Sequence, residues 1–181
     1  KWRAWLDFGT GWSGDIVCHV FDATWKALDL TAPKTIHARV QDSWKNSKPR
    51  RGDTWPQSDH ITWTFPGNSL TEKDEITIEW FDGLFYPPEE AQKWYHGDKY
   101  PPESALIVGT EGAVLIPNGG GAMLLPRDKY KGTIKPDLDP RNHYHHFLDA
   151  ILGKTKNESY FEQTGPMTEA ILLGTVAIRN P

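Results

Sequence analysis

Three stretches of this chain alternate apolar and polar residues, and this alternation limits its possible folds more than any other feature. They cover residues 34–42, 59–66 and 75–82, with an apolar side chain at every second position. Side chains along a β-strand point alternately to opposite faces, so the pattern predicts strands whose sheet is covered on one side. Short polar turns separate the second stretch from the third, which predicts antiparallel neighbours.

Further strands and helices are predicted on both sides of these stretches. Two short strands at 106–109 and 113–116 flank a tight turn, and a last strand is expected at 122–125. Helices are predicted from about residue 13 to 28, from 140 to 152 and from 166 to 179. The order of helix, strands and helices predicts an α+β domain with an open, largely antiparallel (mixed) sheet and helices packed on one face.

Each predicted helix has a start signal and an apolar face. Ser13 or Asp15 would cap the first helix, and Pro166 would stand in the first turn of the last one. We expect the apolar faces to pack on the core. They comprise Ile16, Val20, Ala23, Ala27 and Leu28 in the first helix, Tyr144, Phe147, Leu148 and Ile151 in the second, and Ile171, Leu172 and Val176 in the third.

Composition limits the partners of the chain. It has 181 residues, 38% of them apolar, with nine tryptophans, which is enough for one domain with a core. A net charge of −4 and the lack of a basic block longer than Lys48–Arg51 argue against nucleic acid. No apolar stretch is long enough to span a bilayer, and no signal peptide is present, so we expect no membrane partner.

The single cysteine and the first residue bear on the origin of the chain. Cys18 alone excludes an internal disulfide, and it does not decide between the bacterial cytoplasm and export to the periplasm. The chain begins at Lys1 with no initiator methionine, so we expect that an N-terminal part is missing.

Residues 9–22 contain two signals that point to different functions, and the first is a glycine pattern. Gly9, Gly11 and Gly14 match the G-x-G-x-x-G spacing of dinucleotide-binding loops, which requires a buried strand before it. Only residues 1–8 precede it, and charged residues interrupt them. Asp15 would also place a carboxylate beside the bound phosphates. We therefore expect these glycines to let the backbone turn close to a substrate, and we predict no cofactor-binding residue in this chain.

The second signal is an acid and a histidine four residues apart. On a helix, Asp15 and His19 lie on one face, and Asp22 continues that face. A carboxylate one turn from an imidazole can orient it and raise its pKa, which suits a general acid or base. The alternative is an acidic helix start with a surface histidine, and the spacing alone does not decide between them.

Two other groups of residues bear on the binding of a sugar or a metal ion. The proline-rich segment 83–103 carries five aromatic side chains, Trp94 among them, and forms either a sugar-stacking surface or a loop folded over its own aromatics. His143, His145 and His146 are too close in sequence to converge on one ion, so we predict no metal site.

Five short motifs, spread over nearly the whole chain, resemble one protein family. They read G-W-S-G-D-I-x-C-H-x-F-D at 11–22, A-P-K at 32–34, W-F-D-G at 80–83, G-T-E-G at 109–112 and G-P-M-T-E-A-I-L-L-G at 165–174. This set is similar to the C-terminal domain of the glucose–fructose oxidoreductase / inositol dehydrogenase / MocA family, and most similar to its bacterial members. Family members have a dinucleotide-binding (Rossmann) domain followed by a domain with a large open sheet. The resemblance implies that residues 1–181 are this second domain alone.

The resemblance also implies a site and partners. In the family, the histidine of the Asp-x-x-x-His motif acts as acid/base or substrate ligand at the carbon that undergoes hydride transfer; here it is His19, with Asp15 beside it. Trp12, Asp22 and Trp94 are the candidate substrate-binding residues. The family's lysine from the nucleotide domain has no counterpart in this chain.

The implied function is that of the substrate-binding domain of an NAD(P)-dependent oxidoreductase acting on a sugar, polyol or glycoside. NAD or NADP would be bound mainly by the missing domain, and the chain by itself is expected to be inactive. The implied partners are the substrate and further copies of the chain, joined through the sheet face. A non-catalytic carbohydrate-binding module and a dimerisation domain remain the alternatives.

Overall fold

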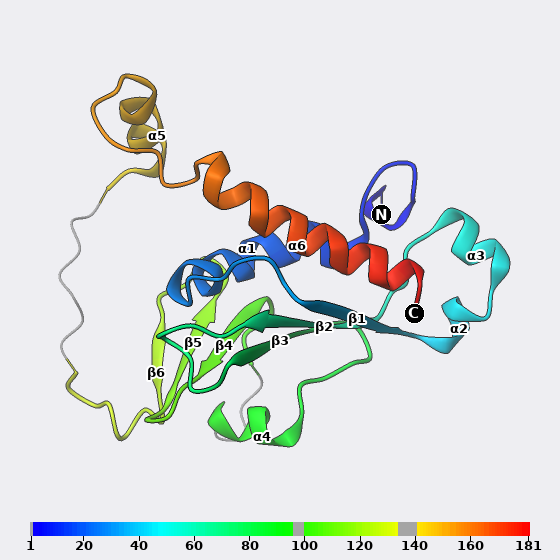
Figure 1. Cartoon of the computed structure of the whole chain (residues 1–181), viewed down its shortest axis with the longest axis horizontal. Coiled ribbons are helices and arrows are strands. Elements are labelled where there is room, and N and C mark those ends of the chain that lie inside the picture. The colour runs from blue at the N-terminus through cyan, green and yellow to red at the C-terminus, as the bar shows by residue number, and fades with distance from the viewer. Residues whose placement is uncertain (1, 96–99, 134–140) are drawn as a thin grey trace.

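The predicted strands form, but they divide into two antiparallel three-stranded sheets (Figure 1). The computed structural model describes residues 2–95, 100–133 and 141–181. The α+β class is confirmed, while the single open sheet of the prediction is replaced by two sheets with the orders β1-β2-β3 and β4-β5-β6. The strands are β1 (Thr35–Val40), β2 (Asp59–Pro66), β3 (Glu75–Phe81), β4 (Ser104–Val108), β5 (Ala113–Pro117) and β6 (Met123–Leu125).

Helices precede, interrupt and follow these strands. The longest are α1 (Gly11–Ala27) and α6 (Phe161–Arg179), which lie side by side over one face of the first sheet (Figure 1). The shorter ones are the 3-10 helices η1 (Trp2–Ala4) and η2 (Lys93–Tyr95), together with α2 (Asp42–Lys45), α3 (Lys48–Asp53), α4 (Glu89–Gln92) and α5 (His143–Ile151).

The first sheet confirms the period-two prediction. In β2, Ile61, Trp63 and Phe65 are almost fully buried, whereas the residues between them are only partly buried. β2 pairs with β3 in antiparallel register, with Trp63 opposite Ile78. Alternate side chains of these strands therefore face the helix layer and form the base of the core.

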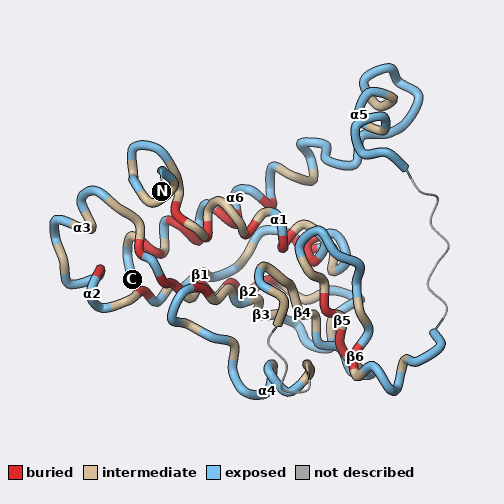
Figure 2. Tube along the Cα trace, turned by 180° about the vertical axis from the view of Figure 1, so that it is seen from behind, coloured by how far each residue is buried: buried red, intermediate tan, exposed pale blue. Residues whose placement is uncertain are grey.

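The main core lies between this sheet and the helices α1 and α6 (Figure 2). The indole Nε1 of Trp63 donates to the backbone oxygen of Ala170 in α6 at 2.9 Å. A β-carbon at Gly174 would lie 2.7 Å from the Trp63 ring, so α6 approaches the sheet closely at this glycine. The buried residues of this core are Val17, Phe21, Trp25, Leu30, Val40, Trp44, Ile61, Trp63, Phe65, Met167, Ala170, Ile171 and Ile178.

The structure corrects the predicted start of two helices. α1 begins at Gly11 with Thr10 as its N-cap residue, so neither Ser13 nor Asp15 caps it. α6 begins at Phe161, and Pro166 lies inside the helix instead of in its first turn.

The apolar faces also differ from the prediction, because packing sets the rotation of each helix. In α1, Ala23 and Ala27 are exposed, and Val17, Phe21 and Trp25 face the core beside Val20. In α6, Leu172 and Val176 are exposed, because the small residues Ala170 and Gly174 allow the opposite side of the helix to meet Trp63.

The α5 prediction fails in a different way. Its helix forms, with the Asn142 side chain accepting hydrogen bonds from the backbone N–H groups of Tyr144 and His145. The predicted apolar face (Tyr144, Phe147, Leu148 and Ile151) is more than half exposed at every position. The reason is visible in Figure 1, where α5 stands away from both sheets. Pro140, the predicted first residue, lies outside the described residues.

Candidate functional site

The predicted acid and histidine lie on the N-terminal half of α1, beside the segment that contains η1. The carboxylate of Asp15 forms an ion pair with Arg3, with Oδ2 at 2.6 Å from Nε. The two side chains are 27% and 25% exposed, so the pair lies at the edge of the solvent. Asp15 is therefore held in place by a cation from a different segment of the chain.

Arg3 is a site residue that the sequence analysis missed. Its guanidinium lies over the rings of Trp2 and Trp12, at 5.4 and 5.2 Å from the ring centroids. Cation–π contacts of this kind hold a guanidinium in a defined position. A basic residue among tryptophans at the start of the chain was the available signal. Trp12, predicted to bind substrate, contacts Arg3 in this structure.

His19 is exposed on the same side of the helix, one turn after Asp15. Within the described part of the chain, its ring forms no hydrogen bond, and the carboxylate of Asp15 is ion-paired with Arg3. The spacing therefore places both side chains on one face, as predicted, but Asp15 does not orient the imidazole directly. The His19 ring is accessible to a ligand.

Asp22 links the two long helices. Its Oδ1 accepts a hydrogen bond from Nε2 of Gln163 in α6 at 3.0 Å, and its Oδ2 lies 3.2 Å from Nζ of Lys26. Lys26 also donates to the backbone oxygen of Glu158. Both oxygens of the Asp22 carboxylate thus have protein partners, which gives this residue a structural task besides the predicted contact with substrate.

Trp94 lies in a different part of the molecule. It belongs to η2 and packs, partly buried, against the small core of the second sheet, which consists of Ala113, Leu115 and Leu125. The rings of Tyr95 and Tyr100 stack in the same cluster at 5.3 Å. Figure 1 places the neighbouring α4 on the side of the strands away from α1. No hydrogen bond or aromatic contact between described residues joins Trp94 to Asp15 or His19, although α1 also lies against β4 and β5 of the second sheet. Residues 96–99 of its loop lie outside the described residues.

The glycine pattern before α1 serves close packing. Gly11 has φ of +79° and touches the Trp55 side chain, and a β-carbon at Gly9 would lie 2.7 Å from the Cα of Arg3. Trp55 Nε1 donates to the backbone oxygen of Gly9 at 2.7 Å. The element before the glycines is a 3-10 helix, so the strand that a dinucleotide loop requires does not precede them. The glycines allow close packing against Arg3 and Trp55, while their expected nearness to a substrate stays a prediction.

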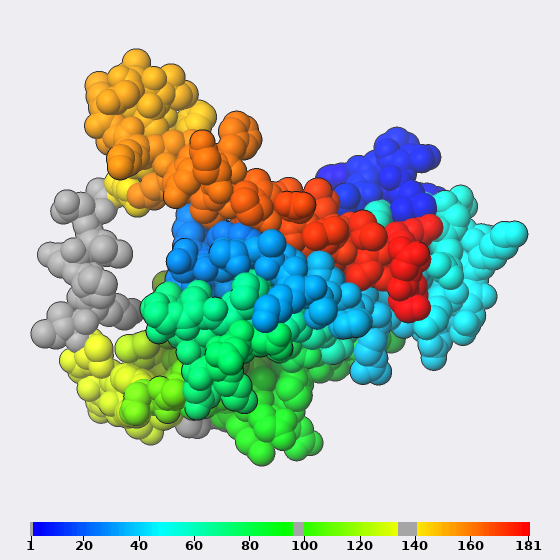
Figure 3. All heavy atoms as spheres, in the orientation of Figure 1, coloured from blue at the N-terminus to red at the C-terminus, as the bar shows by residue number. Residues whose placement is uncertain are grey.

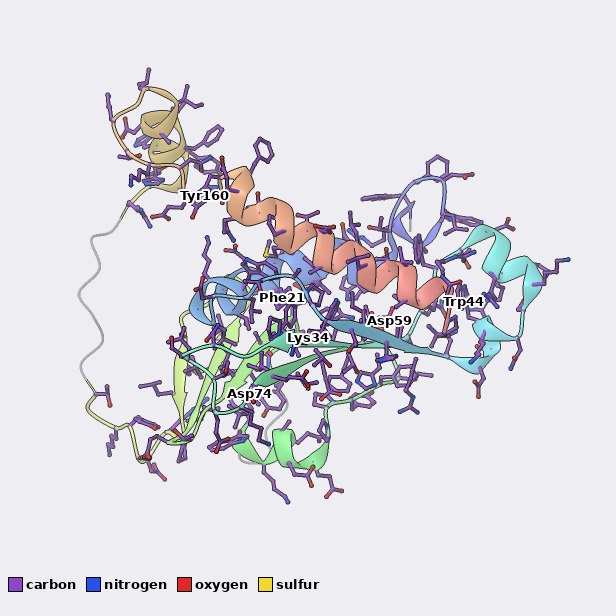
Figure 4. All side chains as sticks on the ribbon, in the orientation of Figure 1. Phe21, Lys34, Trp44, Asp59, Asp74 and Tyr160 are labelled. Carbon is purple, nitrogen blue, oxygen red and sulfur yellow. The ribbon has the colours of Figure 1, made fainter. Side chains whose placement is uncertain are left out.

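A second pair of acids, which the sequence did not single out, is buried beneath the start of α1. Asp59 is 2% exposed and Asp82 is 9% exposed. Figure 4 shows Asp59 between the helix layer and the first sheet. Burial and the nearby Asp82 raise the pKa of Asp59 to about 8, and burial raises the pKa of Asp82 to about 6. Asp59 is in phase with Ile61 and Trp63 of β2, and Asp82 is in phase with the apolar residues of β3, so the alternation was the available signal for their burial.

The described residues form no second arrangement comparable to the α1 site around Cys18 or around a metal ion. Burial, followed by the charge of Asp15, raises the pKa of the Cys18 thiol, which disfavours the thiolate. Across residues 2–95, 100–133 and 141–181, no group of three His, Cys, Asp or Glu side chains is arranged to hold a metal ion. A helix long and apolar enough to cross a membrane is likewise lacking in these ranges.

No protein-family model and no curated protein matches this chain. The assignment of a function therefore depends on the site geometry and on the motifs.

Proposed function

We propose that this chain is the substrate-binding C-terminal domain of an NAD(P)-dependent oxidoreductase of the glucose–fructose oxidoreductase / inositol dehydrogenase / MocA family. Its substrate would be a hydroxyl group of a sugar, polyol or glycoside. The two three-stranded sheets would be parts of the family's open-sheet layer. The observation that carries the proposal is the accessible imidazole of His19, one helical turn from a fixed carboxylate, in a motif that resembles the family's.

The chemistry suits these side chains. When an alcohol is oxidised to a carbonyl, the hydroxyl proton must be removed as hydride leaves the carbon, and a nicotinamide held by another domain would supply the hydride acceptor. His19 would take the hydroxyl proton. Asp15, held by Arg3, would bind a neighbouring hydroxyl of the substrate. The buried side of α1 is anchored in the core, so the helix presents both groups in a defined position.

The outer surface of α6 supports the presence of a further domain. This helix is apolar on its outer side as well as its inner side, and such helices are normally buried all round. Its outer side lines a shallow hollow of about 500 Å³. Figure 3 shows α6, in orange to red, at the surface of the molecule. The exposed apolar residues of α5 and α6 are Tyr144, Phe147, Leu148, Ile151, Phe161, Leu172, Leu173 and Val176. A nucleotide-binding domain that packs on them would bring its cofactor toward α1.

The open face of the first sheet supports the proposed homo-oligomer. The exposed side chains of β1 include His37 and Arg39, whereas those of β3 include Glu75 and Glu79. A surface with basic groups along one strand and acidic groups along another is self-complementary when a second copy is related to it by a two-fold axis. Arg39→Glu is expected to reduce the dimer fraction in sedimentation velocity. An unchanged dimer would exclude this face as the contact.

Ligand binding tests the proposed site directly. Backbone amide NMR spectra of the chain are recorded with increasing amounts of myo-inositol, glucose and a methyl glucoside. We expect shifts centred on residues 11–22, and we expect His19→Ala and Asp15→Asn to reduce the binding at least tenfold. His145→Ala, at an exposed histidine of α5, is the matched control and should bind like the unmodified chain.

The same titrations separate the alternatives. Shifts around Trp94 that survive His19→Ala would replace the proposal with a carbohydrate-binding module. Shifts nowhere in the chain would leave a dimerisation domain. With NAD⁺ or NADP⁺ and a polyol, the isolated chain should form no reduced nicotinamide; formation of it would show that the chain binds the cofactor itself.

A further inference from the structure

The two buried acids Asp59 and Asp82 differ in how their oxygens are satisfied. Asp82 accepts two hydrogen bonds, from the backbone N–H of Asp59 to Oδ1 at 2.6 Å and from Trp80 Nε1 to Oδ2 at 3.2 Å. Asp59 Oδ2 accepts only a long hydrogen bond from the Ser13 hydroxyl, at 3.4 Å. Its Oδ1 has no hydrogen-bonding partner among the described residues. The hydrogen bonds to Asp82 thus stabilise its charged carboxylate form, whereas Asp59 lacks comparable hydrogen bonds.

The surroundings of Asp59 provide no compensating charge. α1 contributes Ser13, β1 contributes Val40 opposite Asp59 in register, and β3 with its following residue contributes Trp80 and Asp82. The charged residues beside Ser13 and Val40 in the sequence are engaged elsewhere, Asp15 with Arg3 and Arg39 with the ring of Phe85. Within the described residues neither buried carboxyl has a cation as partner. Two buried carboxylates so close together, without a cation, are strongly unfavourable.

We propose that Asp59 is protonated in the folded protein and that Asp59 and Asp82 hold one proton between them, forming a clamp that fastens the start of α1 to the first sheet. A neutral Asp59 removes one of the two buried charges. Loss of the proton places a second negative charge in the same apolar space. The hydrogen bond from Ser13 favours the charged form of Asp59, but burial and the charge of Asp82 outweigh it, so deprotonation destabilises the place where α1 meets the first sheet.

The raised pKa values of Asp59 and Asp82 agree with the clamp and define the pH range in which the pair holds one proton. With Asp82 titrating at about 6 and Asp59 at about 8, the pair holds one proton between these pH values. A carboxyl whose pKa is raised by folding contributes stability that is complete below its ordinary pKa and is lost as the pH rises through the folded value. The stability that the clamp contributes is therefore lost as the pH rises from about 4, near the ordinary pKa of 3.8, to about 8, where Asp59 gives up its proton.

The clamp has a consequence for the candidate site, and this step alone depends on the proposed function. Ser13 lies in the same stretch of α1 as Asp15, one turn and a half before His19. Opening of the clamp would allow this end of the helix to move, and with it the two candidate substrate-binding groups. The clamp itself requires no cofactor or sugar.

A direct test is the titration of the aspartate side chains. The full chain is labelled with ¹³C at the aspartate carboxyl carbons, and NMR spectra are recorded from pH 3 to pH 9. We expect one resonance to titrate near pH 8 and to be absent from Asp59→Asn. If every aspartate titrates below pH 5, the proposal is wrong.

Thermal unfolding provides a second measurement. Asn resembles a protonated aspartate in size, so Asp59→Asn should unfold at a midpoint close to that of the unmodified chain at pH 5. As the pH rises to 9, the midpoint of the unmodified chain should fall relative to the variant by several degrees. Asp74→Asn, at an exposed aspartate in the turn between β2 and β3, is the control and should follow the unmodified chain. A constant difference between Asp59→Asn and the unmodified chain at all pH values would overturn the proposal.

Discussion

The helices α1 and α6 form one layer over the first sheet and have similar inner sides, but their outer sides differ. Both helices bury an apolar inner side against the first sheet. On the outer side α1 is polar, with Asp15 and His19, whereas α6 is apolar, with Leu172 and Val176 exposed. A polar outer side is well solvated by water, whereas an apolar outer side is normally buried against another part of a protein. The comparison agrees with the proposed ligand site over α1 and the proposed domain contact over α6.

The largest expected effect separates two neighbouring residues of α6. Ile171 is 4% exposed and Leu172 is 42% exposed. Ile171→Ala should lower the free energy of unfolding by about 2–5 kcal/mol, because it leaves a cavity beside the sheet. Leu172→Ala should cost less than about 1 kcal/mol in this chain. Urea denaturation measures both. Equal losses would mean that the outer side of α6 is covered, and the comparison would no longer hold.

The next effect concerns the buried acids on the inner side of the layer. Asp82→Asn replaces one accepting oxygen with an NH₂ group that faces a donor, either the Asp59 N–H or the Trp80 indole. We expect a loss of about 1–3 kcal/mol at pH 7, since a buried donor is then left without a partner. Unfolding by urea at pH 7 gives this value, with Asp74→Asn as the exposed control. A neutral result would show that the two hydrogen bonds do not hold Asp82.

A smaller effect is expected for the ion pair on the outer side of α1. Asp15→Asn removes the partner of Arg3, but both side chains are about a quarter exposed and solvent screens the attraction. The expected loss of stability is below about 1 kcal/mol, and it should shrink further in 1 M salt. Stability measured at low and high ionic strength tests this. A loss as large as that of Asp82→Asn would mean that the two acids occupy similar environments.

The smallest effect on stability is expected at His19. Its exposed ring has no hydrogen-bonding partner in the described part of the chain, so His19→Ala should change the free energy of unfolding by no more than about 0.5 kcal/mol. A residue that contributes to ligand binding and not to folding shows this behaviour. Should the variant unfold at a clearly lower urea concentration, His19 would have a structural role instead.

Local patterns were sufficient to predict the strands. β2 begins and ends where the alternation of residues 59–66 begins and ends, and β1 and β3 lie within their predicted ranges. Alternation is set by the geometry of each strand, so it is visible without knowledge of the fold. The division into two sheets was not predictable in this way, because strand pairing beyond a hairpin depends on residues far apart in the chain.

The rotation of α6 shows why its inner side was predicted only in part: Ile171 is buried as predicted, whereas Leu172 and Val176 are exposed. Its sequence is apolar on more than one side, so periodicity alone offers several orientations. The structure selects the side with Ala170 and Gly174, because only small residues fit against the Trp63 ring. The ring is contributed by β2, far from α6 in the sequence.

The candidate site was likewise predictable only in the part that depends on local spacing. The shared face of Asp15 and His19 follows from their spacing on a helix, and the structure keeps it. The partner of Asp15 is Arg3, which approaches from the segment before the helix and which no helical spacing indicates.

The sequence by itself determined the elements of this protein, their order and the placement of an acid and a histidine on one helix face, because backbone geometry acts over a few neighbouring residues. Only the tertiary structure decided how completely individual acidic side chains are buried away from solvent. The alternation places Asp59 and Asp82 on the apolar face of their strands, but they are buried together only because α1 covers the place where the start of β2 lies beside the end of β3. Burial, and the pKa shift that it causes, is a property of the assembled fold.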